Sequence, residues 1–125
     1  MSWTYSCPHC RAMLNPHESV ILIGEHGSER VLVGFHPEPG NYQVHLPPGI
    51  EAQTGSHWSF FCPVCHRDLV SEIADTMCAI DLHTPEESHR VFFSRVAGEH
   101  ATFVVSAEWF FFNDTATAEI YTRYL

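Results

Sequence analysis

Two short cysteine motifs constrain this chain more than any other feature. Cys7-Pro8-His9-Cys10 lies near the start of the chain and Cys62-Pro63-Val64-Cys65 near its middle. In each motif the two thiols are three positions apart, so a tight turn can point both sulfurs at one ion. Two such turns together supply four thiolates, the tetrahedral donor set that a structural Zn²⁺ prefers. The spacing therefore predicts one zinc ion per chain, bound by Cys7, Cys10, Cys62 and Cys65.

Length and composition favour a single small domain. The chain has 125 residues, of which 45% are hydrophobic, and this is enough for one core that a metal can supplement. No apolar run reaches the roughly 18 residues of a membrane span. The first residues have neither the basic start nor the apolar stretch of a signal peptide. Thiols kept in pairs then predict a protein of the reducing cytosol rather than a disulfide scaffold.

The charge of the chain argues against nucleic-acid binding. Fifteen acidic residues face six arginines and no lysine, which gives a formal net charge of −9. Proteins that bind nucleic acid need a basic face that displaces counterions from phosphate. The arginines here are scattered along the chain: Arg11, Arg30, Arg67, Arg90, Arg95 and Arg123. We therefore expect a protein partner, which the sequence does not identify.

The remainder of the chain has the alternation of β-strands. A period of two in apolar residues, or a short buried-type run, occurs in six segments: 19–23, 31–35, 42–46, 77–82, 90–96 and 101–107. We call the two four-residue cysteine motifs tetrads. Trp58 and Phe60 lie on one face of a further strand, which leads directly into the second tetrad. Thr84-Pro85-Glu86-Glu87 predicts one helical turn at most. The expected fold is all-β: a zinc ribbon in which the two tight turns around the tetrads, the knuckles, lie on an antiparallel sheet. We expect no internal repeat beyond the tetrads.

Other metal and redox chemistries remain open at the tetrads. Rubredoxins also hold one iron with two such knuckles, but they carry glycine after the second cysteine, where this chain has Arg11 and His66. The first tetrad also matches the motif of strongly oxidising thiol oxidases. There the first cysteine caps a helix, whereas Pro16 ends any helix here almost at once. Zinc is the preferred interpretation.

No other residue set indicates a catalytic or second metal site. His9 and His66 lie in or beside the knuckles and are expected to surround the site rather than to bind the ion. Cys78 falls on an apolar strand face, so we expect a small buried hydrophobe rather than a reactive thiol. The serines, such as Ser56, lack the sequence context of a nucleophile, and no glycine-rich phosphate loop precedes a helix. We expect a protein that is not an enzyme.

The chain resembles small uncharacterised bacterial zinc-ribbon proteins. The resemblance rests on two CPxC motifs about fifty residues apart and on the later phrase Phe93-Ser94-Arg95-Val96-Ala97-Gly98-Glu99-His100-Ala101-Thr102-Phe103. It extends from residue 5 to about residue 107 and implies no activity. It is consistent with a non-enzymatic zinc-binding module for protein interaction or regulation. The alternatives are a nucleic-acid-associated ribbon of the transcription or translation machinery and a rubredoxin-like iron electron carrier.

The last residues form a separate segment. Residues 110–122 resemble a translated sequencing adapter preceded by a run of three phenylalanines. We therefore expect residues 1–108 to form the domain and residues 109–125 to be an artefactual tail, with the natural C-terminus missing. No function is inferred from this segment.

Overall fold

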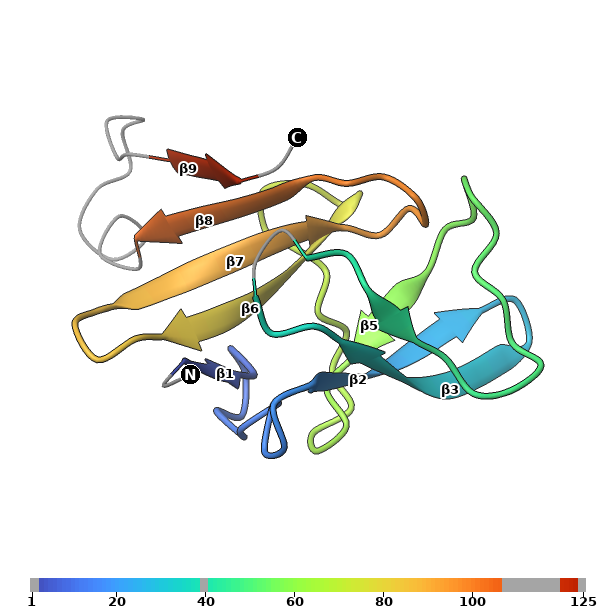
Figure 1. Cartoon of the computed structure of the whole chain (residues 1–125), viewed down its shortest axis with the longest axis horizontal. Coiled ribbons are helices and arrows are strands. Elements are labelled where there is room, and N and C mark those ends of the chain that lie inside the picture. The colour runs from blue at the N-terminus through green and yellow to red at the C-terminus, as the bar shows by residue number, and fades with distance from the viewer. Residues whose placement is uncertain (1–2, 39–40, 107–119, 124–125) are drawn as a thin grey trace.

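The computed structural model describes residues 3–38 and 41–106, together with the backbone of residues 120–123. These residues form nine strands and no helix (Figure 1), so the predicted all-β fold is confirmed. The strands are β1 (Thr4–Ser6), β2 (Val20–His26), β3 (Glu29–Phe35), β4 (Val44–His45), β5 (Ser59–Phe61), β6 (Met77–His83), β7 (Ser88–Ser94), β8 (Thr102–Ser106) and β9 (Ile120–Arg123). Among the described residues no helix could cross a membrane.

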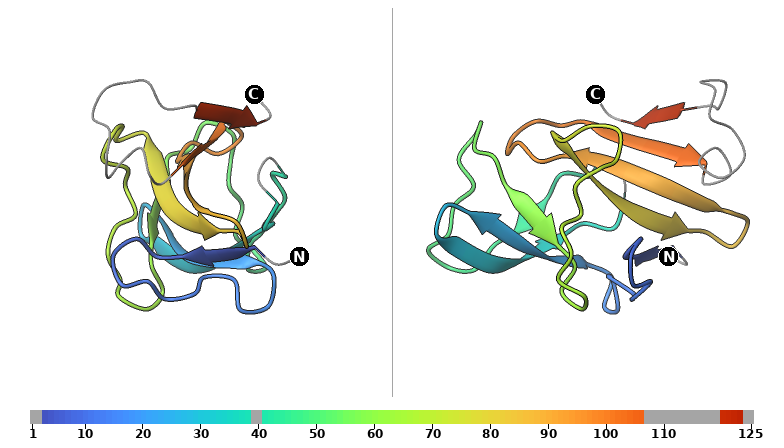
Figure 2. Two further views of the ribbon diagram at one scale, coloured as in Figure 1. Left: turned by 90° about the vertical axis from the view of Figure 1, so that its left-hand side faces the viewer. Right: turned by 180° about the vertical axis from the view of Figure 1, so that it is seen from behind.

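The strands form two antiparallel sheets that face each other across one main core. The first sheet has the order β1-β6-β7-β8-β9 and the second the order β4-β3-β2-β5, and Figure 2 shows the two layers from the side and from behind. Leu22 and Val33 of the second sheet and Ile80 and Val91 of the first are all buried in this core. The alternation at 31–35 and 77–82 therefore predicted the buried faces of β3 and β6 correctly.

The short strand before each tetrad pairs with a strand from the other part of the sequence. β1 precedes the first tetrad but pairs with β6, where Tyr5 lies opposite Leu82. β5 precedes the second tetrad but pairs with β2, where Phe60 lies opposite Gly24. The two parts of the chain thus exchange their first strands.

This exchange is one element of an internal pseudo-two-fold repeat. Strands β1 to β4 of an N-terminal half (residues 3–46) correspond to strands β5 to β8 of a C-terminal half (residues 58–104). Tyr5 corresponds to Phe60, a shift of 55 positions, and both occupy the same register position opposite their partner strands. After the tetrads the shift is 58 positions: the pair Val20 and Phe35 recurs as Cys78 and Phe93, and Phe35 with Val44 recurs as Phe93 with Thr102.

The expectation that nothing repeats beyond the tetrads is therefore wrong. The repeat is also present in the sequence, as a pattern Trp, Ser or Thr, Tyr or Phe, x, Cys-Pro-x-Cys, three residues, Leu. Its first copy runs from Trp3 to Leu14 and its second from Trp58 to Leu69. Conservative differences such as Tyr for Phe obscure it, because strand positions accept any residue of similar shape.

Two further local expectations differ from the structure. Thr84–Glu87 forms no helical turn, because β6 and β7 pair as far as His83 and Ser88 and leave only a four-residue hairpin turn. In that turn the Thr84 backbone N–H donates to the Glu87 carbonyl over 3.0 Å, and the Glu87 N–H donates to Thr84 Oγ1 over 3.2 Å. The strand predicted at 42–46 is only the two residues of β4, and Val44 is 44% exposed.

The predicted tail lies mostly outside the described residues. Of residues 109–125, the structure describes the backbone of β9, which pairs with β8 so that Val104 lies opposite Tyr121. The interpretation of this segment as an artefact stays a prediction.

Candidate metal centre

The first tetrad is held in a compact knuckle by the backbone around it. The chain leaves β1, turns through the tetrad and returns so that the Leu14 N–H donates to the Tyr5 carbonyl over 2.8 Å. Inside this loop the Cys7 N–H donates to the Ala12 carbonyl over 3.0 Å, and the Arg11 N–H donates to the Cys7 carbonyl over 2.8 Å. The positions of both thiols are therefore fixed by main-chain bonds and not by side-chain packing alone.

The second tetrad repeats this arrangement bond for bond. The Leu69 N–H donates to the Phe60 carbonyl over 2.9 Å and closes the loop. The Cys62 N–H donates to the Arg67 carbonyl over 3.1 Å, and the His66 N–H donates to the Cys62 carbonyl over 2.9 Å. The leucine that ends each loop is buried, with an exposed fraction of 1% in both cases, and anchors the knuckle in the core.

Arg11 and His66 adopt the backbone conformation in which glycine is usually found. Their φ angles are 65° and 64°, in the left-handed region that costs a side-chain-bearing residue free energy. Both knuckles form nevertheless, and backbone N–H groups reach the sulfurs of Cys7 and Cys62. The lack of glycine at these two positions therefore does not by itself separate a zinc site from an iron site.

Backbone donors surround the first sulfur of each tetrad in the same way. The His9 and Cys10 N–H groups lie 3.3 and 3.5 Å from Cys7 Sγ. The N–H groups of Val64 and Cys65 lie 3.3 and 3.4 Å from Cys62 Sγ. Donors aimed at sulfur stabilise the negative charge of a thiolate, which is the form that binds metal.

The two knuckles bring all four sulfurs into one cluster. Cys7 Sγ lies 3.8 Å from Cys65 Sγ, and Cys10 Sγ lies 3.7 Å from Cys62 Sγ, with all four atoms within 4.8 Å of one another. In a tetrahedral site with Zn–S bonds of about 2.3 Å, the sulfurs are about 3.8 Å apart. The predicted ligands therefore fit a tetrahedrally bound ion, and each half of the chain supplies two of them.

Burial and hydrogen bonding give the thiols different acidities when no ion neutralises them. Burial raises the pKa of Cys7 to about 12 and also raises the pKa of Cys62. At the exposed Cys10, a hydrogen bond from the Ala12 backbone lowers the pKa to about 7. A bound cation must therefore displace protons from the buried pair, and metal binding is coupled to proton release.

The remaining candidate residues lie outside this cluster. His9 and His66 are exposed and are not part of the four-thiol group, which is the one set of three or more metal-binding side chains found among the described residues. Cys78 is fully buried, and burial raises its pKa to about 12, which fits the small hydrophobe expected at this position. The structure thus brings together the four cysteines that the sequence singled out, in a cluster that could hold a metal ion. The sequence analysis missed the symmetry that relates the two knuckles.

Comparison with known proteins assigns no relative to this chain. No family model matches it, and neither does any curated protein or solved structure. Its function has to be inferred from the site.

Proposed function

We propose that this protein is a non-enzymatic zinc-binding module in which one zinc ion, held by four cysteines, joins two interlocked halves and presents a surface to a protein partner. The observation that carries this proposal is the cluster of four thiols, two from each half, at the spacing of a tetrahedral zinc–tetrathiolate site.

A structural role for the ion is favoured over a catalytic one. Catalytic zinc keeps an open coordination position for water or substrate, whereas four thiolates fill all four positions. Cys7 and Cys62 are also completely buried, which leaves little room for a substrate beside them. The ion would instead connect chain segments more than fifty residues apart, so that its binding energy is largely folding energy.

A protein partner is favoured over a nucleic acid. The formal net charge of −9 and the two additional negative charges of a zinc–tetrathiolate group repel phosphate. Apolar side chains are exposed in and after the knuckles: Met13 is 54% exposed, Val64 64% and Ile73 59%. Side chains of this kind next to a rigid, metal-held turn are suited to contact another protein.

Elemental analysis of purified variants tests the metal assignment. Cys62→Ser should lose both the zinc and cooperative unfolding, because three thiolates leave the long loop open. Cys78→Ala is the matched control: it removes a buried thiol that lies outside the cluster, and it should keep one zinc per chain. Zinc retained in Cys62→Ser would contradict the assignment, and a red protein containing iron would favour the rubredoxin-like alternative.

Comparative affinity capture tests the interaction role. Val64→Ser, in the second knuckle, should remove at least one partner that the wild-type protein captures at physiological salt. Leu32→Ser is the control, because Leu32 is 58% exposed on β3, away from the tetrads in the chain. Identical capture by the wild type and Val64→Ser would show that the knuckle surface is not the interface.

A further inference from the structure

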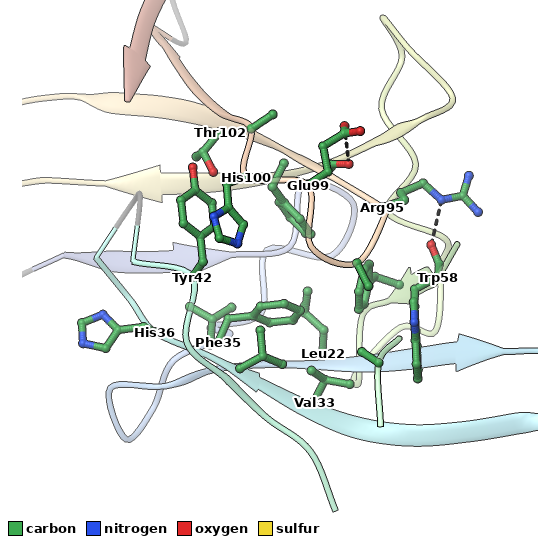
Figure 3. Close-up of a pocket in the computed structure, with 18 of the residues that line it drawn as sticks. Leu22, Val33, Phe35, His36, Tyr42, Trp58, Arg95, Glu99, His100 and Thr102 are labelled. Atoms are coloured by element: carbon green, nitrogen blue, oxygen red, sulfur yellow. Dashed lines mark hydrogen bonds between the residues drawn. The ribbon is translucent and has the colours of Figure 1, made fainter. Parts of the chain in front are cut away.

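A cavity of about 180 Å³ lies between the two sheets. Its walls are apolar and come from both halves of the chain. Figure 3 shows Leu22, Val33 and Phe35 pointing into it from the second sheet. Val91 and Phe93 of β7 complete the wall on the other side.

Equivalent residues of the two pseudo-two-fold-related halves line the cavity. Val33 corresponds to Val91 and Phe35 to Phe93, each at the shift of 58 positions, and the Phe35 and Phe93 rings lie 5.9 Å apart. Protein interiors rarely contain voids larger than a water molecule. An engineered apolar cavity of about 150 Å³ is large enough to take up benzene. A space of this size between the sheets is therefore large enough for one aromatic ring.

Two equivalent hairpin loops form the exposed end of this cavity. The loop between β3 and β4 contributes Glu38 and Tyr42, and the loop between β7 and β8 contributes Glu99 and His100. Tyr42 and His100 occupy corresponding positions, again 58 apart, and their rings stack with centroids 4.2 Å apart and planes 5° from parallel. Each loop thus brings one ring and one carboxylate to the mouth.

The charge at the mouth is negative. Glu38 and Glu99 both line the cavity and are exposed. Arg95 also lines it, but Figure 3 shows its guanidinium turned away from the apolar wall. That group donates to the Trp58 carbonyl over 2.9 Å, to Ser59 Oγ over 2.8 Å and to the Asp75 carbonyl over 2.7 Å. The carboxylates at the mouth are therefore available to a cation that enters from solvent.

We propose that this cavity binds a small organic cation: one apolar ring packed against the wall to which Phe35 and Phe93 both belong, with an ammonium group at the mouth beside Glu38 and Glu99. The apolar wall supplies the affinity and the carboxylates supply the selectivity for charge. This inference goes beyond the interaction role proposed above and does not depend on it.

Titration of the zinc-loaded protein with two matched probes tests the proposal. 2-Phenylethylamine and phenylacetate share a ring and a similar length but have opposite charges, and pH 8 keeps histidine charge out of the comparison. The amine should shift the methyl NMR signals of Val33 and Val91 with a dissociation constant of about 1 mM or lower. Phenylacetate should bind at least about tenfold more weakly, because attraction becomes repulsion. No saturable shift, or equal affinity for both probes, would overturn the proposal.

Two variants separate the ring site from the charge site. Val91→Phe adds a ring to the cavity wall and should abolish binding of the amine, while Leu32→Phe, on an exposed position of β3, should leave it unchanged. Undiminished binding by a folded, zinc-loaded Val91→Phe would contradict the proposed location. Glu99→Gln tests the proposal if Val91→Phe does not fold. Glu99 is exposed, and among the described residues its side chain accepts a hydrogen bond only from the Ser94 hydroxyl. This variant should weaken the amine and strengthen phenylacetate, and an unchanged ratio would refute the role of the mouth carboxylates.

Discussion

Residues of one type serve different purposes in this protein, and their surroundings decide which. Four of the five cysteines meet in the four-thiol cluster, whereas Cys78 is buried in β6 between apolar neighbours. The spacing of the tetrads was sufficient to predict that these four thiols meet, and the alternation of β6 was sufficient to predict a buried Cys78. Neither pattern could indicate that Arg11 and His66 adopt positive φ, because that conformation is imposed by the closed loop around each tetrad.

Cys78 should make the stability of the protein sensitive to alkaline pH. Burial raises its pKa from 9.0 to about 12, so the folded state binds the thiol proton more tightly than the unfolded state does. The contribution is fully present below pH 9 and is lost as the pH rises toward 12. Between pH 8 and pH 10.5 the loss should be about 2 kcal/mol.

Urea unfolding of the wild type and Cys78→Ala at these two pH values measures this effect. The variant is expected to be less stable at pH 8, because it leaves a small cavity, but to lose less stability at pH 10.5. Parallel losses in the two proteins would mean that other groups cause the alkaline destabilisation.

At the scale of single elements, sequence patterns located strands well and failed where pairing partners decided the outcome. β2, β3, β6 and β7 were expected close to where they lie. A short apolar run indicated β2, and apolar alternation indicated β3 and β6. The turn at Thr84–Glu87 carries the residues of a helix start, but the pairing of β6 with β7 leaves no room for one. Local propensity is overridden there by a tertiary contact.

The packing of β2 against its neighbours depends on the absence of a side chain at Gly24. A Cβ atom at Gly24 would lie 2.7 Å from Val33 Cγ2 and 3.3 Å from Trp58 Cε3, whereas a Cβ at Gly34 would meet its nearest atom at 3.5 Å. Gly24→Ala should therefore destabilise the fold by about 1–3 kcal/mol through overpacking, and Gly34→Ala should be close to neutral. Thermal unfolding of both variants checks this difference. Equal stability would show that β2 can move away from β3 at little cost.

The tail contributes β9 to the edge of the first sheet, and truncation tests whether that contribution matters. If residues 109–125 are artefactual, they were never selected to pack against the domain. Removal of everything after Glu108 should leave zinc content and melting temperature nearly unchanged, and loss of the Phe110-Phe111-Phe112 run should improve solubility. A fall of several degrees in melting temperature would instead identify β9 as a genuine strand of the fold.

At the scale of the whole molecule, the dominant feature is the relation between its two halves. A search for a shift of 55 positions, with Tyr and Phe treated as equivalent, would have found the repeated pattern around the tetrads. The exchange of β1 and β5 between the sheets was beyond such a search, because both strands could satisfy the same pattern by pairing within their own half. Which half each of these strands pairs with depends on the length and path of the segments that connect it to the rest of the chain.

The net charge of the molecule predicts whether it binds polyanions. With a formal charge of −9 and no lysine, it should show no measurable binding to random duplex DNA or RNA at about 0.15 M salt, where screening limits charge effects to roughly 8 Å. A gel-shift assay measures this directly. A salt-sensitive complex at micromolar protein would instead favour the nucleic-acid-associated alternative.

The exchange of first strands also determines how the protein would respond to a break in its own backbone. A protease that cut the segment between residues 46 and 57 would produce two fragments, yet each would keep a strand hydrogen-bonded into the sheet of the other. Each fragment would also retain two of the four thiols that could together hold a metal ion. The nicked chain is therefore expected to remain one particle, held together by topology and metal where the peptide bond no longer does so.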